Sequence, residues 1–314
     1  MIPFAIAGVQ MHVAASRDNT QAMLHKIDLV MASFPWTQMI LFSELAACGP
    51  LPHDPQVLPG SNEQALAAAA ARHGVWIING SAFERGADGR IHNTASVINP
   101  QGEVIRRYRK MFPFRPYERD VAAGTEFCVF DVPGTGRFGL SICYDMWFPE
   151  TTRTLTALGA EVILHPVLTR TIDRDVEIAM ARAAAAQGQC FVFDINGLAA
   201  GGIGRSSVFS PSGGVLHQAG GQDEIIPIEV DLAQVRRQRE RGLFGLGQVL
   251  KSFRDREVDF PVYDRSTGTD AWLHTLGPLR MPDKGGRAGL DAPAPGEALP
   301  RPVTAAAASG NDTS

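Results

Sequence analysis

The sequence predicts an α/β fold class, in which helices pack on sheets. Short apolar runs typical of buried strands alternate with segments whose apolar residues recur at helical spacing, which is the pattern of a layered α/β domain. Between residues 95 and 142, four strand-like runs follow one another with no helical pattern between them. This hairpin-rich middle argues against a purely parallel, doubly wound sheet.

The first half of the chain alternates strands and helices. A helix is predicted at residues 20–33, where apolar side chains recur at helical spacing. Ser61 and Gln64 form a capping-box pattern before an alanine-rich helix that Gly74 closes. The strands predicted in this half cover residues 4–10, 38–45 and 75–79.

The second half continues the alternation after the hairpin-rich middle. Residues 134–139 satisfy the GxGxxG spacing of a dinucleotide-binding loop, but they lead into a strand where that motif requires a helix, so they predict a hairpin turn. The predicted strands are 95–99, 104–108, 127–132, 138–142, 162–165 and 190–195, and the predicted helices are 149–158 and 173–187.

Three of the strands end on polar side chains that suit nucleophilic catalysis. One apolar strand ends at Cys143, and the N–H groups of the turn that follows can hold an oxyanion beside the thiol. Glu44 ends another strand, where its carboxylate can act as a general base. Lys110 follows a third, where its ammonium can stabilise both a thiolate and an oxyanion.

Glu44, Lys110 and Cys143, in this order along the chain, resemble the catalytic triad of the nitrilase superfamily of carbon–nitrogen hydrolases. The resemblance implies a four-layer α-β-β-α sandwich of two sheets, with the active site at the strand ends. It covers roughly residues 3 to 262 and rests on Phe42-Ser-Glu44, Tyr108-Arg-Lys110, Ile142-Cys-Tyr-Asp145, Phe148-Pro-Glu150, Gly159-Ala-Glu-Val-Ile-Leu-His-Pro166, Ala181-Arg-Ala183 and Ser210-Pro-Ser-Gly213.

The domain organisation follows from this coverage and from composition. Residues 1–264 are expected to form the carbon–nitrogen hydrolase domain. From about Pro282 the sequence shifts to Ala, Pro and Gly with few large apolar residues. Residues 265–314 are therefore expected to form a C-terminal arm that is poorly ordered or docks on a partner subunit.

The resemblance implies a covalent mechanism for cleaving an amide to a carboxylic acid and ammonia. Glu44 would take the proton of the Cys143 thiol, which would attack the amide carbon and form a thioester. Lys110 and the N–H of Tyr144 would hold the oxyanion, each donor contributing about 3 kcal/mol in comparable sites. Glu118, eight residues after Lys110, matches a second glutamate of many family members and would orient Lys110 or the substrate nitrogen.

Residues around the nucleophile bear on the substrate. Tyr144-Asp145 resembles the amidase and carbamoylase branches, whereas nitrilases of the superfamily usually carry Trp-Glu there. The carbamoyl hydrolases often follow with arginines that bind a substrate carboxylate, and this chain has Met146 and Trp147. An amidase-like activity on a small amide is therefore favoured; an N-carbamoyl-amino-acid amidohydrolase, a nitrilase and a non-catalytic amide binder remain the alternatives.

Four residues are expected to line the substrate pocket. Tyr144 and Trp147 follow the nucleophile directly and give the pocket an aromatic character. His165 and Asn196 end two later strands and can reach the same edge, although a histidine at such a position is often a core residue satisfied by protein groups.

Composition sets the remaining expectations for this chain of 314 residues. The net charge of −4 gives no reason to expect nucleic acid or an anionic membrane surface as a partner. No metal-ligand spacing and no cofactor motif is found, so neither is expected. The four cysteines lack disulfide-scaffold spacing, and no signal peptide or membrane span is evident, which predicts a cytoplasmic protein.

The resemblance also implies how the protein assembles. Subunits of the family pair through the helices that correspond to residues 151–158 and 173–187 here, which predicts a homodimer or a larger even-numbered assembly.

Overall fold

The structure is a computed structural model that describes residues 3–15, 18–51, 54–264, 266, 268 and 270–282. The chain divides into two compact units, one formed by residues 1–114 and 118–254 and the other by residues 115–117 and 255–314. The first unit holds every residue predicted for the active site. The predicted domain boundary at residue 264 stays a prediction, and most of the predicted arm lies outside the described residues.

The described residues form fifteen strands and six α-helices with the following bounds. The strands are β1 (Pro3–Gln10), β2 (His12–Val13), β3 (Met39–Phe42), β4 (Trp76–Ile78), β5 (Ala82–Arg85), β6 (Ile91–Ile98), β7 (Val104–Arg109), β8 (Cys128–Val132), β9 (Gly136–Leu140), β10 (Val162–Val167), β11 (Phe191–Asn196), β12 (Leu198–Ala199), β13 (Ser207–Phe209), β14 (Val215–Gln218) and β15 (Glu224–Asp231) in the described part of the chain. The α-helices described are α1 (Thr20–Ser33), α2 (Ser61–His73), α3 (Pro149–Ala157), α4 (Arg174–Gly188), α5 (Leu232–Arg241) and α6 (Val249–Arg254), and the 3₁₀ helices are η1 (Cys143–Trp147), η2 (Leu243–Gly245), η3 (Pro261–Tyr263) and η5 (Leu273–Leu276).

Both large sheets are mixed, as the hairpin-rich middle of the sequence predicted. The first has the order β15-β1-β3-β4-β6-β5, with β7 also paired to β6, and the second has the order β14-β13-β11-β10-β9-β8. Parallel pairing joins β1, β3 and β4 in the first sheet and β9, β10 and β11 in the second. The carboxyl ends of β3 and β9, which lead to Glu44 and Cys143, can therefore come together at one edge.

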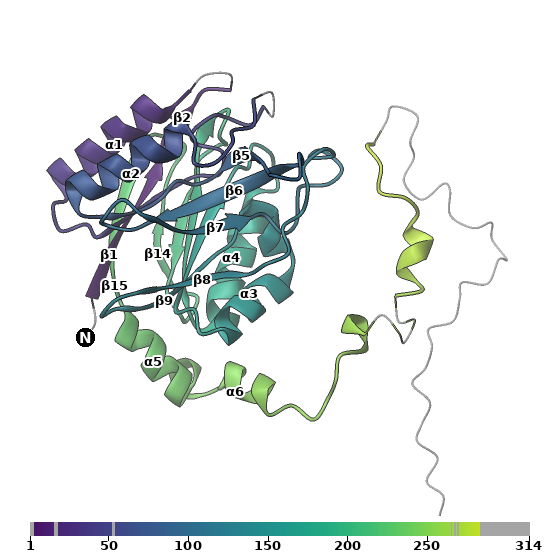
Figure 1. Cartoon of the computed structure of the whole chain (residues 1–314). Coiled ribbons are helices and arrows are strands. Elements are labelled where there is room, and N and C mark those ends of the chain that lie inside the picture. The colour runs from purple at the N-terminus through teal and green to yellow at the C-terminus, as the bar shows by residue number, and fades with distance from the viewer. Residues whose placement is uncertain are drawn as a thin grey trace, which may run out of the picture. The chain divides into compact units, whose positions relative to one another are not determined.

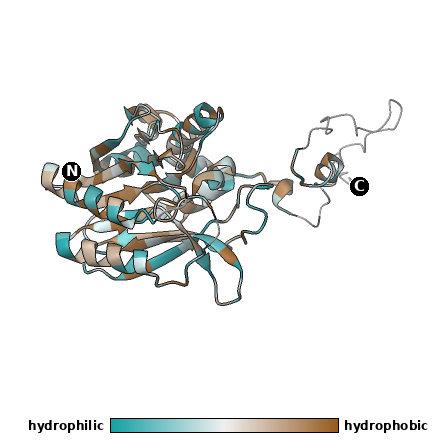
Figure 2. Ribbon diagram, turned by 90° about the horizontal axis from the view of Figure 1, so that it is seen from above, coloured by the Kyte–Doolittle hydropathy of each residue, from teal (hydrophilic) through white to brown (hydrophobic). Residues whose placement is uncertain are grey.

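Three layers of apolar contact hold the first unit together. The sheets pack face to face through side chains such as Phe4, Leu41 and Phe138. α1 and α2 cover the outer face of the first sheet, and α3 and α4 cover that of the second (Figure 1). Hydrophobic residues accordingly follow the central strands in Figure 2. The four-layer α-β-β-α sandwich is confirmed.

Two local predictions have different outcomes. Residues 134–139 form the turn and first part of the β8–β9 hairpin and make no dinucleotide loop, as predicted. The capping box at Ser61 is wrong, because α2 begins at Ser61 itself with Gly60 as its N-cap and no side-chain cap. Gly74 ends α2 in the left-handed conformation with φ 66°, which glycine adopts without a Cβ clash.

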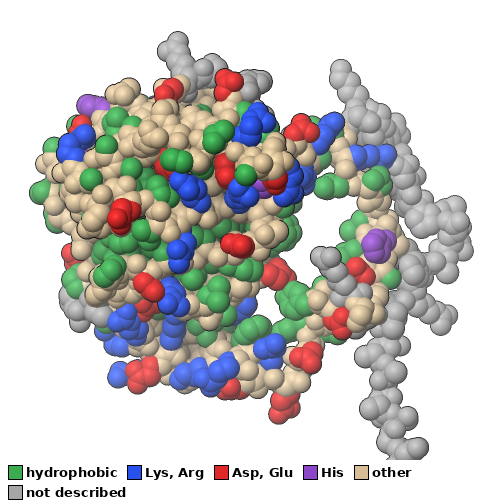
Figure 3. Space-filling model, in the orientation of Figure 1, with side chains coloured by type: hydrophobic (Ala, Val, Ile, Leu, Met, Phe, Trp, Pro, Cys, Tyr) green, Lys and Arg blue, Asp and Glu red, His purple; other side chains and the backbone are tan. Residues whose placement is uncertain are grey.

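The surface of the protein carries both signs of charge. Acidic and basic side chains are interspersed on the face shown in Figure 3. The arginine-rich run at residues 236–241 lies on α5, where Arg236 pairs with Glu161 and Arg239 donates to backbone carbonyls including that of Gln189. Among the residues that the structure describes, no helix has the length and apolar character needed to cross a membrane.

Candidate active site

The three polar strand ends meet in the interior of the first unit. Lys110 Nζ lies 2.8 Å from Glu44 Oε1 and 3.0 Å from Glu118 Oε2. Lys110 is 1 % exposed and Glu44 is 2 % exposed. Burying charged groups is favourable only when they are paired and hydrogen-bonded, so the ammonium between two carboxyl groups stabilises an otherwise costly arrangement.

Glu44 is fixed by contacts from both sheets. It follows β3 by two residues, and its backbone N–H donates to the carbonyl of Val167 at the end of β10. Asn93 Nδ2, from β6, donates to Glu44 Oε1 at 2.8 Å. The sequence analysis missed Asn93. No sequence signal singles it out, because β6 also holds the buried polar residues His92, Thr94 and Ser96.

Lys110 is placed where β7 ends. Its backbone N–H donates to the carbonyl of Asn93 at 2.8 Å, and its own carbonyl accepts from Gly124 at 2.8 Å. The side chain therefore leaves a backbone that is held on both sides. The side chain of Glu118 lies beside Lys110, because its Oε2 accepts hydrogen bonds from Lys110 Nζ and from the backbone N–H of Phe114.

Cys143 stands at the first position of η1 in a strained conformation. Its φ is 46°, in the left-handed region that residues with a Cβ seldom adopt. The thiol Sγ lies 3.9 Å from the carbonyl oxygen of Leu168. Such a sharp turn between a strand and a helix presents a nucleophile at the strand tip together with the N–H groups of the turn.

Asp145 holds this turn against the lysine segment. Its carboxylate accepts hydrogen bonds from the backbone N–H of Ile142 and of Phe112, each at 2.8 Å, and from the hydroxyl of Tyr108 at 2.7 Å. Asp145 is fully buried, and burial raises its pKa to about 6, although these three donors oppose the rise. This residue orients the site without being part of the predicted triad.

The electrostatics set the protonation states of the triad. Burial raises the pKa of the Cys143 thiol well above its usual value, with Glu44 adding to the rise and Lys110 opposing it. Burial also raises the pKa of Glu44, while Lys110 and a hydrogen bond with Cys143 lower it. Burial alone would lower the pKa of Lys110, but Glu44, Cys143 and Glu118 together raise it well above the ordinary lysine value. These shifts favour the neutral thiol of Cys143 and the charged ammonium of Lys110.

Aromatic rings gather beside the nucleophile. Tyr144 lies with its ring centroid 5.8 Å from that of Trp147, 5.3 Å from that of Phe148 and 5.1 Å from that of Phe114. Tyr144 and Trp147 are half-buried. Both therefore lie near Cys143 with part of their surface free, although contact with a substrate stays a prediction.

His165 and Asn196 lie deeper. His165 is buried, its Nδ1 lies 2.8 Å from the hydroxyl of Ser141, and burial lowers its pKa to about 4. Asn196 is fully buried, donates to the carbonyls of Thr169 and Gly204, and accepts the N–H of Thr169. These contacts hold the loop after β10, and a role for either residue in substrate binding stays a prediction.

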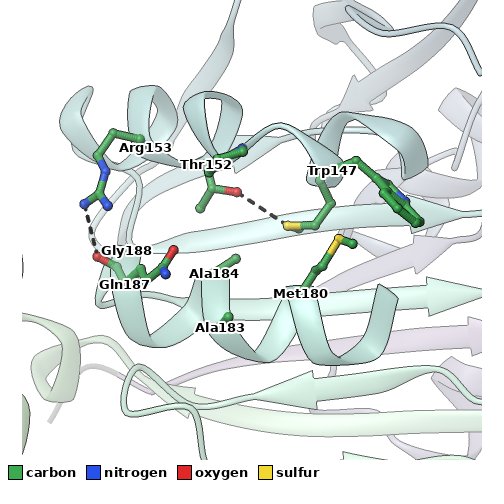
Figure 4. Close-up of a pocket in the computed structure, with 10 residues that line it drawn as sticks. Trp147, Thr152, Arg153, Met180, Ala183, Ala184, Gln187 and Gly188 are labelled. Carbon is green, nitrogen blue, oxygen red and sulfur yellow. Dashed lines mark hydrogen bonds between the residues drawn. The ribbon is translucent and has the colours of Figure 1, made fainter. Parts of the chain in front are cut away.

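A pocket of about 280 Å³ opens next to this region, on the outer side (Figure 4). It lies between α3 and α4 and contains none of the triad residues. The side chains that line it are Met146, Trp147, Pro149, Thr152, Arg153, Met180, Ala183, Ala184, Gln187 and Gly188. Among the described residues, no three His, Cys, Asp or Glu side chains lie together as a metal site.

Comparisons with known proteins agree with this geometry. Residues 5–240 match the family model described as carbon-nitrogen hydrolase. The human omega-amidase NIT2 is 28% identical over 214 residues, covering 60% of this chain and 74% of that protein. The 2-oxoglutaramate amidase of Bacillus subtilis (strain 168) is 33% identical over 185 residues, covering 56% and 69%.

A solved structure shows the same fold. The carbon-nitrogen hydrolase from Helicobacter pylori G27 superposes with a TM-score of 0.71 at 22% identity, over 84% of this chain and 98% of that one. The family model covers most of the compact unit that contains Glu44, Lys110 and Cys143. The chain therefore belongs to the carbon–nitrogen hydrolase family and is an enzyme of the amidase-like branch of the nitrilase superfamily.

Proposed function

We propose that the protein hydrolyses a small amide to a carboxylic acid and ammonia through a thioester on Cys143. The observation that carries this proposal is the position of Lys110 between Glu44 and Glu118, at 2.8 and 3.0 Å, with the charges of Glu44 and Lys110 both acting on the pKa of the Cys143 thiol. A base, a cation and a nucleophile then surround one point at the strand ends, which is the arrangement that acyl transfer requires.

The first half of the reaction forms the thioester. Because burial keeps the Cys143 thiol protonated, a base must take its proton as Sγ attacks the amide carbon, and Glu44 is that base. The amide oxygen becomes an oxyanion held by Lys110 and the N–H of Tyr144. Glu44 then gives its proton to the nitrogen, the C–N bond breaks and ammonia leaves.

The second half releases the acid. Glu44 takes a proton from water, whose oxygen attacks the thioester carbon, and the same donors hold the second oxyanion. When this intermediate collapses, the C–S bond breaks and the proton returns to Sγ. Glu118 keeps Lys110 in place throughout.

The choice of amide over nitrile or carbamoyl substrates rests on two supports. The relatives named above are an omega-amidase and a 2-oxoglutaramate amidase. Tyr144-Asp145 and Trp147 follow Cys143 in this chain, in place of Trp-Glu and of an arginine. We expect primary amides to give higher kcat/KM values than nitriles of the same acyl group, and equal or higher values for the nitriles would contradict this choice.

Replacement of the nucleophile tests the mechanism. Cys143→Ala should lower amide hydrolysis by about a thousandfold or more, because the covalent step is lost. Cys190→Ala is the matched control, since Cys190 is also buried but lies at the start of β11, away from the triad. Circular dichroism of both variants checks that the fold is kept. Hydrolysis by Cys143→Ala within about tenfold of the wild type would refute the assignment.

We also propose that two copies pair through α3 and α4. The pocket between these helices has a largely apolar lining, and Val176 on α4 is 47 % exposed. Closed two-fold dimers are the commonest homo-oligomers, and a second copy placing the same helices there would cover these side chains. A cytoplasmic location is proposed as well, in keeping with four cysteines that are all free.

A further inference from the structure

A buried carboxyl group that the proposed mechanism does not use lies next to the aromatic side chains. Glu177 on α4 is 8 % exposed. Its Oε2 accepts a hydrogen bond from the hydroxyl of Thr169, and its Oε1 lies 3.4 Å from the indole Nε1 of Trp147. A carboxyl group at such a depth is rare unless it has a structural or functional role.

Three observations place Glu177 beside the nucleophile. Trp147, which donates to Glu177, packs against Tyr144, the residue after Cys143. Thr169, its other donor, follows Leu168, whose carbonyl oxygen lies 3.9 Å from Cys143 Sγ. The charge of Glu177 also contributes to the raised pKa of Cys143. The carboxyl group therefore lies behind the side of the site formed by Trp147 and Thr169.

The nearby cation does not fully neutralise this group. Arg174 is 1 % exposed and directs its Nη2 to Asp194 Oδ1 at 2.6 Å, whereas its Nη1 reaches Glu177 Oε2 only at 3.5 Å. Asp194 adds a second negative charge to the cluster. Burial raises the pKa of Glu177 to about 7. The ionised carboxylate can only accept hydrogen bonds, whereas the protonated group can also donate one.

The cation that pairs with Glu177 is Arg174, which Glu177 shares with Asp194. Trp147 itself donates to Glu177, and Arg205, a second basic side chain near α4, is paired with Asp175 on the exposed side of the helix. A substrate carboxylate reaching Trp147 would therefore approach a cluster in which two carboxyl groups, Glu177 and Asp194, share one cation, Arg174. An ammonium or hydroxyl there would find an acceptor.

We propose that Glu177 sets the acyl specificity of the site, favouring amides whose acyl chain ends in a hydrogen-bond donor or cation and disfavouring those that end in a carboxylate. This inference rests on the proposed function, and it names the substrate class more closely. It sets the protein apart from an enzyme such as a 2-oxoglutaramate amidase, whose substrate carries a carboxylate at the far end of its acyl chain.

Binding measurements separate this inference from the hydrolysis itself. Three amides of matched length serve as probes: 4-aminobutyramide (cationic), pentanamide (neutral) and glutaramate (anionic). Their dissociation constants are measured by calorimetry on the Cys143→Ala protein, in which turnover is absent. We expect the cationic amide to bind about tenfold more tightly than the anionic one, since a hydrogen bond to a charged group is worth about that much or more.

The added substitution Glu177→Gln should reduce this ratio by about fivefold or more, because the amide keeps the shape but loses the charge. The matched control is Asp175→Asn, which removes a negative charge from the same helix at a side chain that is 72% exposed. It should leave the ratio unchanged. A ratio of one or below in the starting protein, or a ratio that survives Glu177→Gln, would overturn the inference.

Two further readouts keep the test decisive. If Glu177→Gln does not fold, Trp147→Arg in the same background places a cation on this wall and should also lower the ratio; an unchanged ratio overturns the proposal. Hydrolysis of the three amides by the wild-type enzyme is measured separately. Failure to hydrolyse any amide would count against the proposed function, whereas the binding ratio still tests the specificity.

Discussion

The carboxylate of Asp145 binds the backbone N–H of Phe112 at 2.8 Å and thereby joins the nucleophile turn to the lysine segment. Its other oxygen accepts the N–H of Ile142, the residue before Cys143, and the hydroxyl of Tyr108, two residues before Lys110. One buried side chain thus links the segments that carry Cys143, the proposed nucleophile, and Lys110, the proposed oxyanion-binding cation. An enzyme loses activity when its active-site groups move by about 1 Å, so this link should matter for catalysis.

Asp145→Asn should weaken this link. An amide group has only one oxygen, so its NH₂ must face at least one of the three donors. We expect a loss of about 1–3 kcal/mol in the free energy of unfolding and a fall of about tenfold or more in kcat with a smaller change in KM. Urea unfolding and steady-state kinetics measure both. Asp131→Asn, at an exposed carboxylate paired with Arg137, is the control; an Asp145→Asn enzyme as active as this control would argue against the link.

Glu118→Gln should slow the chemical step. Lys110 would keep a hydrogen-bond partner but lose one of its two carboxylates, so it would be held less firmly toward the oxyanion. We expect kcat/KM to fall by about tenfold to a thousandfold. Glu126→Gln, at an exposed glutamate of the same connecting segment, should stay near the wild-type value. Equal kinetics of the two variants would remove Glu118 from the site.

The pH dependence of stability should change when Glu177 is replaced. The pKa of Glu177 is about 7 in the folded protein against 4.5 in its ordinary state, so the folded state binds its proton more tightly. The stability that this tighter proton binding gives the folded state is fully present below pH 4.5 and is lost as the pH rises through 7. Over that range it amounts to the order of 3 kcal/mol.

Glu177→Gln should therefore flatten the unfolding free energy between these two pH values relative to the wild type. Urea unfolding at several pH values measures the difference between the two proteins. Parallel curves would show that Glu177 titrates normally in the folded state.

Assembly gives a further prediction. Val176 and Met180 lie four residues apart on one face of α4, next to the pocket between α3 and α4. Val176→Arg should shift the protein from dimer to monomer, because a charge would be buried without a partner. Leu29→Arg on α1, at a side chain 37 % exposed on the opposite layer, is the control. Light scattering that shows a wild-type monomer at micromolar concentration would contradict the proposal.

The sequence predicted much of this architecture because its signals are local. The helix expected at residues 20–33 is α1 with the same bounds, since its apolar spacing identifies the buried face directly. The four-layer arrangement came from the family resemblance, because periodicity shows that a segment is buried but not which sheet it joins. The capping box failed because Ser61 is itself helical, and a preceding glycine serves as the cap.

The site was predictable to the extent that its residues end strands. Glu44, Lys110 and Glu118 come together as the resemblance implied. Asn93 and Glu177 were missed, because each lies within a strand or helix and becomes part of the site only through contacts between distant segments. Both elements hold other polar residues as well, so their sequences neither single out these two positions nor name their partners.

Intact-protein mass spectrometry tests most directly whether a thioester forms on Cys143. The enzyme is mixed with a small primary amide, quenched with acid within milliseconds to seconds, weighed, and digested to locate the adduct. We expect a mass increase equal to the acyl group on the peptide that contains Cys143, and release of this acyl group as the hydroxamate when hydroxylamine is present. Steady hydrolysis with no adduct under any quench time and no hydroxamate, or an adduct on Cys48, Cys128 or Cys190 instead, would contradict it.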